Sequence, residues 1–180
     1  MRFKLRQARH YIRTGAVIAY PTESVYGLGC DPLNPLAVQR LLQLKQRPAH
    51  KGLIIIASQP GQLLPYVDWR GDWIEKVLTR WPGPYTWLLP ALPHLPDWLQ
   101  GHHQRIACRV TDHPIAAALC DTVGHAIIST SANRSGRSAA RSACQVQQHC
   151  PGVDWILRGA LGGLTHTTSI QDACTDERVR

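Results

Sequence analysis

The chain has 180 residues, 44% of them hydrophobic, which is typical of one globular domain whose core needs neither disulfides nor metal. It has no run of about 20 apolar residues that would span a membrane, and its charged first residues lack the apolar core of a signal peptide, so we expect a cytoplasmic protein. Lysine and arginine number 20 against 12 aspartate and glutamate, a net charge of +8; nucleic acid, nucleotide phosphates or another anionic partner would explain the excess, and a basic protein without such a partner is the alternative.

The first predicted element is an amphipathic helix over residues 2–14. Its apolar face carries Leu5, Ala8 and Ile12, and a neighbouring face carries Arg2, Arg6, Arg9 and Arg13. Short apolar runs and capping signals then predict strands that alternate with helices. We expect strands over residues 16–20, 52–57, 85–89, 105–110, 126–129, 153–157 and 168–170, and helices over residues 34–47, 72–80, 114–121 and 142–149. This alternation predicts the α/β class with a mixed sheet, in a single domain over residues 1–180.

Three cations, Lys45, Arg47 and Lys51, lie within seven residues near the predicted end of a helix. A cation at that end gains stability from the helix dipole, which is one explanation of the cluster. Clustered cations beside a proline turn also suit the clamping of a polyphosphate. Spacing alone leaves both explanations open.

Two loops follow buried strands, which is where α/β sheets bind ligands. Residues 129–136 (STSANRSG) offer hydroxyls, an amide and a guanidinium that suit an anion, and an ordinary Ser/Asn turn is the alternative. Residues 21–29 (PTESVYGLG), expected to form a loop, contain two glycines that permit close approach of the backbone to a ligand. The second loop matches neither a Walker A motif nor a dinucleotide fingerprint.

Six cysteines are present, and none belongs to a Cys-x-x-Cys pair of the kind that structural zinc sites use. The nearest approach to a cluster is Cys144 with His149 and Cys150. We therefore expect reduced thiols and no metal bound by protein ligands.

Together these segments resemble the YrdC-type threonylcarbamoyl-AMP synthases, in the single-domain bacterial form often called TsaC. The motifs occur in the family's order over about residues 8–180: PTESVYGLG at 21–29, KQRP at 45–48, WPGP at 81–84, Arg109 with DHP at 112–114, and STSANRSG at 129–136. The resemblance implies an open twisted mixed sheet with flanking helices and a concave basic face.

The resemblance also implies a reaction. L-threonine and bicarbonate or CO2 give N-carboxythreonine, whose carboxylate attacks the α-phosphate of ATP to form threonylcarbamoyl-adenylate and pyrophosphate. A separate transferase complex then moves the threonylcarbamoyl group to adenosine 37 of tRNA. Mg2+ is expected to arrive with the ATP, held mainly by phosphates and water, and tRNA or other structured RNA is an expected partner of the basic face.

The family motifs imply a role for each matching residue of this chain. The catalytic set would be Lys45, Arg47, Ser131 and Asn133. The ATP-binding set would be Arg47, Lys51, Ser131, Asn133 and Arg180. The L-threonine-binding set would be Thr22, Ser24, Tyr26, Arg109, Ser129 and Thr168. The chain departs from the family pattern at Ser24, where threonine is commoner, at Thr111, where many relatives have proline, and at Thr168-Ser169-Ile170, which reorders the usual Ser-Thr-Ile.

Two other functions stay open. The basic first helix suits a double-stranded RNA or tRNA-binding module, although the chain lacks an aromatic RNA-reading motif. A carbamoyl-adenylate-forming activity, as in the related domain of hydrogenase maturation proteins, is the other alternative, although those relatives carry acylphosphatase and zinc-finger segments that have no match here.

Overall fold

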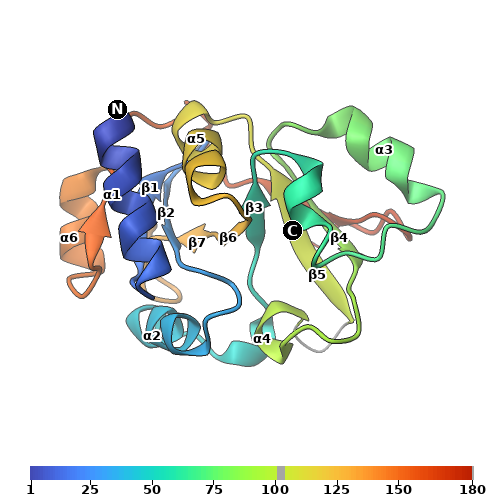
Figure 1. Ribbon diagram of the computed structural model, residues 1–180, viewed down its shortest axis with the longest axis horizontal. Helices are drawn as coiled ribbons and strands as arrows, with labels where there is room; N and C mark the ends of the chain where they lie inside the picture. The colour runs from blue at the N-terminus through green and yellow to red at the C-terminus, as the bar shows by residue number, and fades with distance from the viewer. Residues whose placement is uncertain (101–103, 180) are drawn as a thin grey trace.

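The computed structural model describes residues 1–100 and 104–179 as a layered arrangement of α-helices and β-strands (Figure 1). The described helices are α1 (Arg2–Arg13), α2 (Pro35–Lys45), α3 (Trp73–Arg80), α4 (Asp97–Gln100), α5 (Pro114–Val123) and α6 (Ala143–His149), with 3-10 turns η1 (Ala49–Lys51) and η2 (Pro60–Leu63). The described strands are β1 (Ile18–Pro21), β2 (Tyr26–Gly29), β3 (Ile55–Ala57), β4 (Tyr85–Pro90), β5 (Arg105–Val110), β6 (Ile127–Ile128), β7 (Thr130–Ser131), β8 (Trp155–Ile156) and β9 (Ser169–Asp172). Among these helices none has the length and apolar character needed to cross a bilayer.

The described strands form two mixed sheets, where a single mixed sheet was expected. One sheet has the order β7-β2-β1-β8 and the other has the order β6-β3-β5-β4-β9. Parallel pairs (β1 with β8, β3 with β5, β4 with β9) occur beside antiparallel ones, so the predicted α/β class with mixed pairing is confirmed. The division arises because the chain changes partners between β6 and β7: β6 pairs with β3 and β7 pairs with β2.

Strand β1 is buried on both faces and separates two groups of core side chains. Ile18 and Tyr20 pack with the apolar faces of α1 and α5, whereas Val17 and Ala19 belong to the larger core on the other side. Helix α1 presents Leu5, Ala8 and Ile12 inward as predicted, and Figure 1 shows it lying beside α5. Helices α1 and α5 thus cover the face of β1 that carries Ile18 and Tyr20.

The segment over residues 21–29 is not the loop that the sequence predicted, because its second half forms β2. Thr22 closes a tight turn by donating from its N–H (3.1 Å) and its Oγ1 (2.7 Å) to the carbonyl of Val25. Residues Tyr26–Gly29 then pair antiparallel with β1. Because glycine is depleted in strands, residue propensities do not identify β2 as a strand. Here Gly29 is required, since a Cβ at this position would lie 2.4 Å from the carbonyl oxygen of Ile128.

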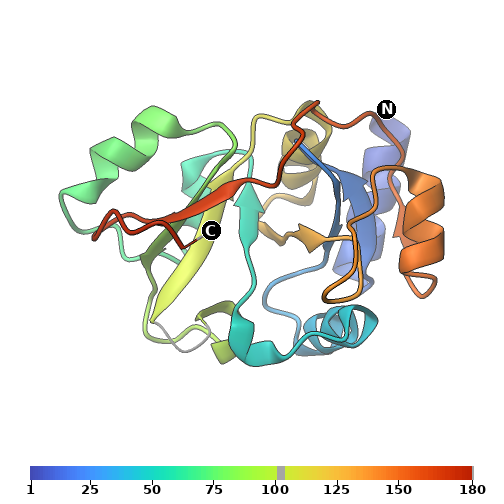
Figure 2. The same cartoon turned by 180° about the vertical axis from the view of Figure 1, so that it is seen from behind.

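Three connections of the described chain run between the sheets: from β2 to β3, from β6 to β7 and from β8 to β9. The last two frame the space between the sheets. At the end of β6, the N–H of Ile128 donates to the carbonyl of Cys30 (3.0 Å), and just after it the N–H of Ser129 donates to the carbonyl of Ile54 (2.8 Å). Residues 157–168 connect β8 of the first sheet to β9 of the second and run across the molecule in Figure 2. Polar side chains near both connections therefore lie between the sheets.

Candidate functional site

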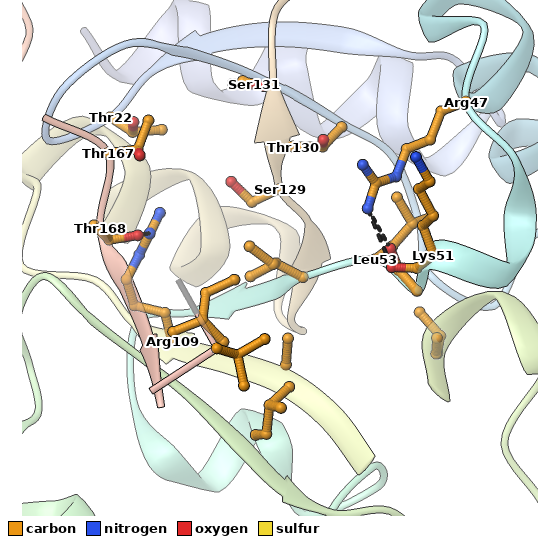
Figure 3. A pocket seen from close by; sticks show the side chains of 18 of the residues that line it. Thr22, Arg47, Lys51, Leu53, Arg109, Ser129, Thr130, Ser131, Thr167 and Thr168 are labelled. Atoms are coloured by element: carbon orange, nitrogen blue, oxygen red, sulfur yellow. Dashed lines mark hydrogen bonds between the residues drawn. The ribbon is translucent and has the colours of Figure 1, made fainter. Parts of the chain in front are cut away.

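A cavity of about 320 Å³ is lined by residues from both sheets and from the segments between them. Figure 3 shows Arg109 with Thr168 at one side of this cavity and Arg47 with Lys51 at the other, with Ser129 between them. Segments more than 60 residues apart in the sequence thus meet at one place.

The end of α2 directs two neighbouring cations to different places. Asn34 accepts a hydrogen bond from the N–H of Ala37 (3.1 Å) and begins the helix, and Gln46 ends it in a left-handed conformation with φ of 50°. After this turn the guanidinium of Arg47 lines the cavity, and its Nη2 donates to the carbonyls of Lys51 (3.1 Å) and Gly52 (3.0 Å). Arg47 is thereby held against the η1 turn.

Lys45 lies before this turn and points into the protein, with 2% of its surface exposed. Its Nζ donates to the carbonyl of Ser131, to the carbonyl of Asn133 (3.0 Å) and to Oδ1 of Asn133 (3.1 Å). Ser131 Oγ also donates to Oδ1 of Asn133 (2.6 Å). Burial lowers the pKa of Lys45 to about 8. All three ammonium hydrogens have acceptors in one loop, so Lys45 fixes the shape of residues 131–133.

Arg109 comes from β5 and is 5% exposed. Its Nη1 donates to Oγ1 of Thr168 (2.8 Å), and its Nη2 lies 3.3 Å from a carboxylate oxygen of Glu23. Thr168 in turn lies 3.3 Å from Oγ1 of Thr86. The guanidinium is therefore fixed from two sides while it lines the cavity.

The structure brings together eight of the residues that the sequence singled out. Thr22, Ser24, Arg109, Ser129 and Thr168 of the predicted threonine set line the cavity, as do Arg47, Lys51 and Ser131 of the predicted ATP set. The reordered Thr168-Ser169-Ile170 stretch places Thr168 there. The shared cavity on which the functional interpretation depends is therefore present.

Three predicted site residues are not among those that line the cavity. Lys45 and Asn133 lie behind it, engaged with each other and with Ser131. Tyr26 is buried, and its hydroxyl donates to the carbonyl of Gly159 (2.8 Å) and accepts from the N–H of the same residue (3.2 Å). The Tyr26 side chain points from β2 toward the connection after β8, so its hydroxyl contacts support the fold. Arg180 lies outside the described residues.

Sequence reasoning missed several lining residues. Arg105 lies at the start of β5 and pairs with Asp172 on β9 at 3.2 Å. Gln100 and Leu99 come from α4, a helix of four residues that gives no periodic signal. Thr167, next to Thr168 in the chain, is the one whose position in a hydroxyl-rich stretch could have identified it.

The cavity is cationic. Its described lining includes Arg47, Lys51, Arg105 and Arg109 and no carboxylate. Within residues 1–100 and 104–179, no cluster of three or more His, Cys, Asp or Glu side chains could hold a metal ion. An anion is the ligand that this arrangement favours.

A family model for the Sua5, YciO and YrdC proteins, described as "Telomere recombination", matches residues 10–179. A protein of Pseudomonas putida strain KT2440 named threonylcarbamoyl-AMP synthase is 50% identical over 180 residues, covering 99% of this chain and 97% of its own. A protein of the same name from Alkalilimnicola ehrlichii is 51% identical over 178 residues, covering 96% of this chain and 92% of its own.

Two solved structures share the fold. P. abyssi Sua5 in complex with L-threonine is 33% identical, with a TM-score of 0.88 over 96% of this chain. The present chain spans about half of it, 51%. E. coli YciO is 28% identical, with a TM-score of 0.85 over 99% of this chain and 88% of its own.

The buried position of Lys45 gives a pH-dependent prediction. Between about pH 8 and the unshifted value of 10.5, the unfolded chain keeps a proton on this lysine that the folded chain has lost. Raising the pH through this window should therefore stabilise folded wild type relative to a Lys45→Met variant. Denaturant unfolding of both proteins at pH 7 and pH 10 measures the change, and a difference in stability that stays constant with pH would contradict it.

Proposed function

The chain belongs to the Sua5/YciO/YrdC family, and from this premise we propose that it forms L-threonylcarbamoyl-adenylate from L-threonine, bicarbonate or CO2 and ATP, with release of pyrophosphate. The product is the activated intermediate of N6-threonylcarbamoyladenosine formation at position 37 of tRNA. The observation that carries this proposal is the shared cavity in which Arg47 and Lys51 face Arg109 across the hydroxyls of residues 129–131.

The Arg109 side of the cavity suits an amino acid. A planar guanidinium pairs with a carboxylate through two parallel N–H bonds. The hydroxyls of Ser129 and Thr168 line the same region and can bond the amino or hydroxyl group of threonine. Thr22 and Ser24 complete this region from the turn before β2.

The Arg47 side suits the triphosphate. Cations at residues 47 and 51 neutralise phosphate oxygens, and Ser131 adds a hydroxyl from β7. Lys45 acts from behind by holding the backbone of Ser131 and Asn133 in place. Mg2+ would enter with the ATP, held mainly by phosphate oxygens and water.

The reaction needs positioning and charge neutralisation more than covalent help. The threonine amine adds to CO2 and loses a proton, which gives a carbamate. A carbamate oxygen forms the new bond to the α-phosphorus, and the bond from that phosphorus to the bridging oxygen of pyrophosphate breaks. With the amino acid beside Arg109 and the phosphates beside Arg47, attack across the cavity requires no residue to act as a nucleophile.

The proposal predicts that pyrophosphate release requires ATP, L-threonine and bicarbonate together. Release measured with each substrate omitted in turn should fall to background, because the carbamate forms only from the amino acid and CO2. Release that persists without threonine would contradict the proposal. Carbamoyl phosphate offered in place of threonine and bicarbonate tests the carbamoyl-adenylate alternative in the same assay.

The role of Arg47 is tested by Arg47→Ala with Arg40→Ala as the matched control. Arg40 lies on α2 and pairs with Asp154 at 2.6 Å, and it does not line the cavity. Loss of a preorganised charge at the phosphates should lower kcat/KM for ATP by about 100-fold or more in Arg47→Ala. Equal effects of the two substitutions on kcat/KM would contradict the assignment of Arg47 to the phosphates.

Binding of tRNA or other structured RNA is a separate prediction, favoured by the exposed arginines Arg2, Arg6 and Arg13 of α1. Affinity measured by filter binding should fall steeply as salt rises, and replacing these three arginines by glutamine should flatten that dependence. Unchanged salt dependence in the triple variant would contradict a role for α1. Transfer of the product to tRNA by a separate transferase complex belongs to the same proposal.

A further inference from the structure

Glu23 is a buried carboxylate next to the proposed amino-acid region, and it does not itself line the cavity. It is 4% exposed, and Arg109, its partner at 3.3 Å, is 5% exposed. A charge this far from water is costly unless a partner compensates it. The pair therefore fixes the Glu23 carboxylate and the Arg109 guanidinium relative to each other.

Thr111 fixes the second oxygen of this carboxylate. Its Oγ1 accepts a hydrogen bond from the N–H of His113 (3.2 Å), so its own hydrogen is left to donate to Oε1 of Glu23 at 2.5 Å. The direction of this bond requires an acceptor, which an ionised carboxylate provides. Thr111 is 1% exposed, so water does not replace it.

The base of this chain of bonds is rigid. The N–H of Thr111 donates to the carbonyl of Ala57 on β3 (3.0 Å). His113 begins α5, where its Nδ1 accepts from the N–H of Ala116 (3.3 Å), and its Nε2 lies 3.1 Å from the carbonyl of Ala160. Thr111 is thus tied to a strand, a helix and the connection after β8.

At its other end, this series of hydrogen bonds reaches the cavity through Arg109. Arg109 uses Nη1 for Thr168 and faces Glu23 with Nη2, whereas its buried Nε has no hydrogen-bond acceptor among the described residues. Each Nη carries two hydrogens, so the guanidinium keeps donor capacity for an anionic group while Glu23, outside the cavity lining, and Thr168 fix its orientation. An arginine held in its binding orientation loses less freedom when a ligand binds.

We propose that Thr111 and Glu23 are positioning residues for the amino-acid substrate, acting through Arg109 on its carboxylate. The inference rests on the proposed function, since it assigns the carboxylate of L-threonine to Arg109. Neither residue touches the substrate. The chain from the start of α5 through Thr111 and Glu23 to Arg109 makes the affinity for threonine depend on a hydroxyl outside the cavity.

Thr111→Val tests the proposal because it keeps the shape of the side chain and replaces the hydroxyl with a methyl group, which cannot donate a hydrogen bond. We expect KM and Kd for L-threonine to rise about tenfold, as expected for a lost hydrogen bond to a charged group, while KM for ATP stays within about twofold. Thr111→Ser should restore both threonine constants to within about twofold. Thr122→Val is the matched control, since it removes a partly buried hydroxyl that bonds the carbonyl of Ala118 on α5 (2.6 Å).

Glu23→Gln is the second variant. It keeps the size of the side chain and removes the charge that faces Arg109, so the threonine constants should rise at least as much as in Thr111→Val. Thermal melting of each variant accompanies the kinetics and a calorimetric titration with L-threonine. A parallel loss of threonine and ATP affinity with a lowered melting temperature would mark a general structural role and overturn the proposal.

The outcomes distinguish a failure of the proposed function from a failure of the positioning role of Thr111 and Glu23. Wild type without threonine-dependent turnover overturns the proposed function, and the titration with L-threonine then decides the positioning role alone. Wild type that is active, with unchanged threonine KM and Kd in Thr111→Val, overturns the positioning role and leaves the function in place. Wild type that does not bind L-threonine overturns both.

Discussion

The exchange of strand partners at residues 127–131 is the constraint on which the site depends. Ile128 and Ser129 donate backbone hydrogen bonds to Cys30 and Ile54, which belong to different segments of the chain. These bonds hold the two sheets side by side and place the hydroxyls of residues 129–131 between Arg47 and Arg109. Without this crossing, the proposed phosphate region and the proposed amino-acid region would have no common wall.

The charged groups of the site lie at two depths, at the cavity and buried next to it. Arg47 lines the cavity directly, whereas Lys45, two residues earlier, is buried and donates hydrogen bonds to the loop that carries Ser131. Arg109 likewise lines the cavity, with Glu23 behind it. In both cases a buried charged group fixes the position of a group at the surface of the cavity. Such preorganisation favours a reaction in which charge neutralisation and orientation supply most of the rate enhancement.

The sequence predicted the elements that have a clear period or cap, such as α1 and the Asn34 start of α2. It missed β2, because glycines hide the strand until pairing with β1 forms it. Local spacing does not show that Gln46 turns Lys45 inward and Arg47 outward. The bond from Thr111 to Glu23 joins residues 88 positions apart, so only the fold reveals it.

A crystal structure with L-threonine and a non-hydrolysable ATP analogue tests the central claim most directly. The account predicts the threonine carboxylate on Arg109, the phosphates on Arg47 and Lys51, and the amino nitrogen turned toward the α-phosphorus across Ser129 and Ser131. Phosphates bound outside the cavity, or threonine bound away from Arg109, would contradict it.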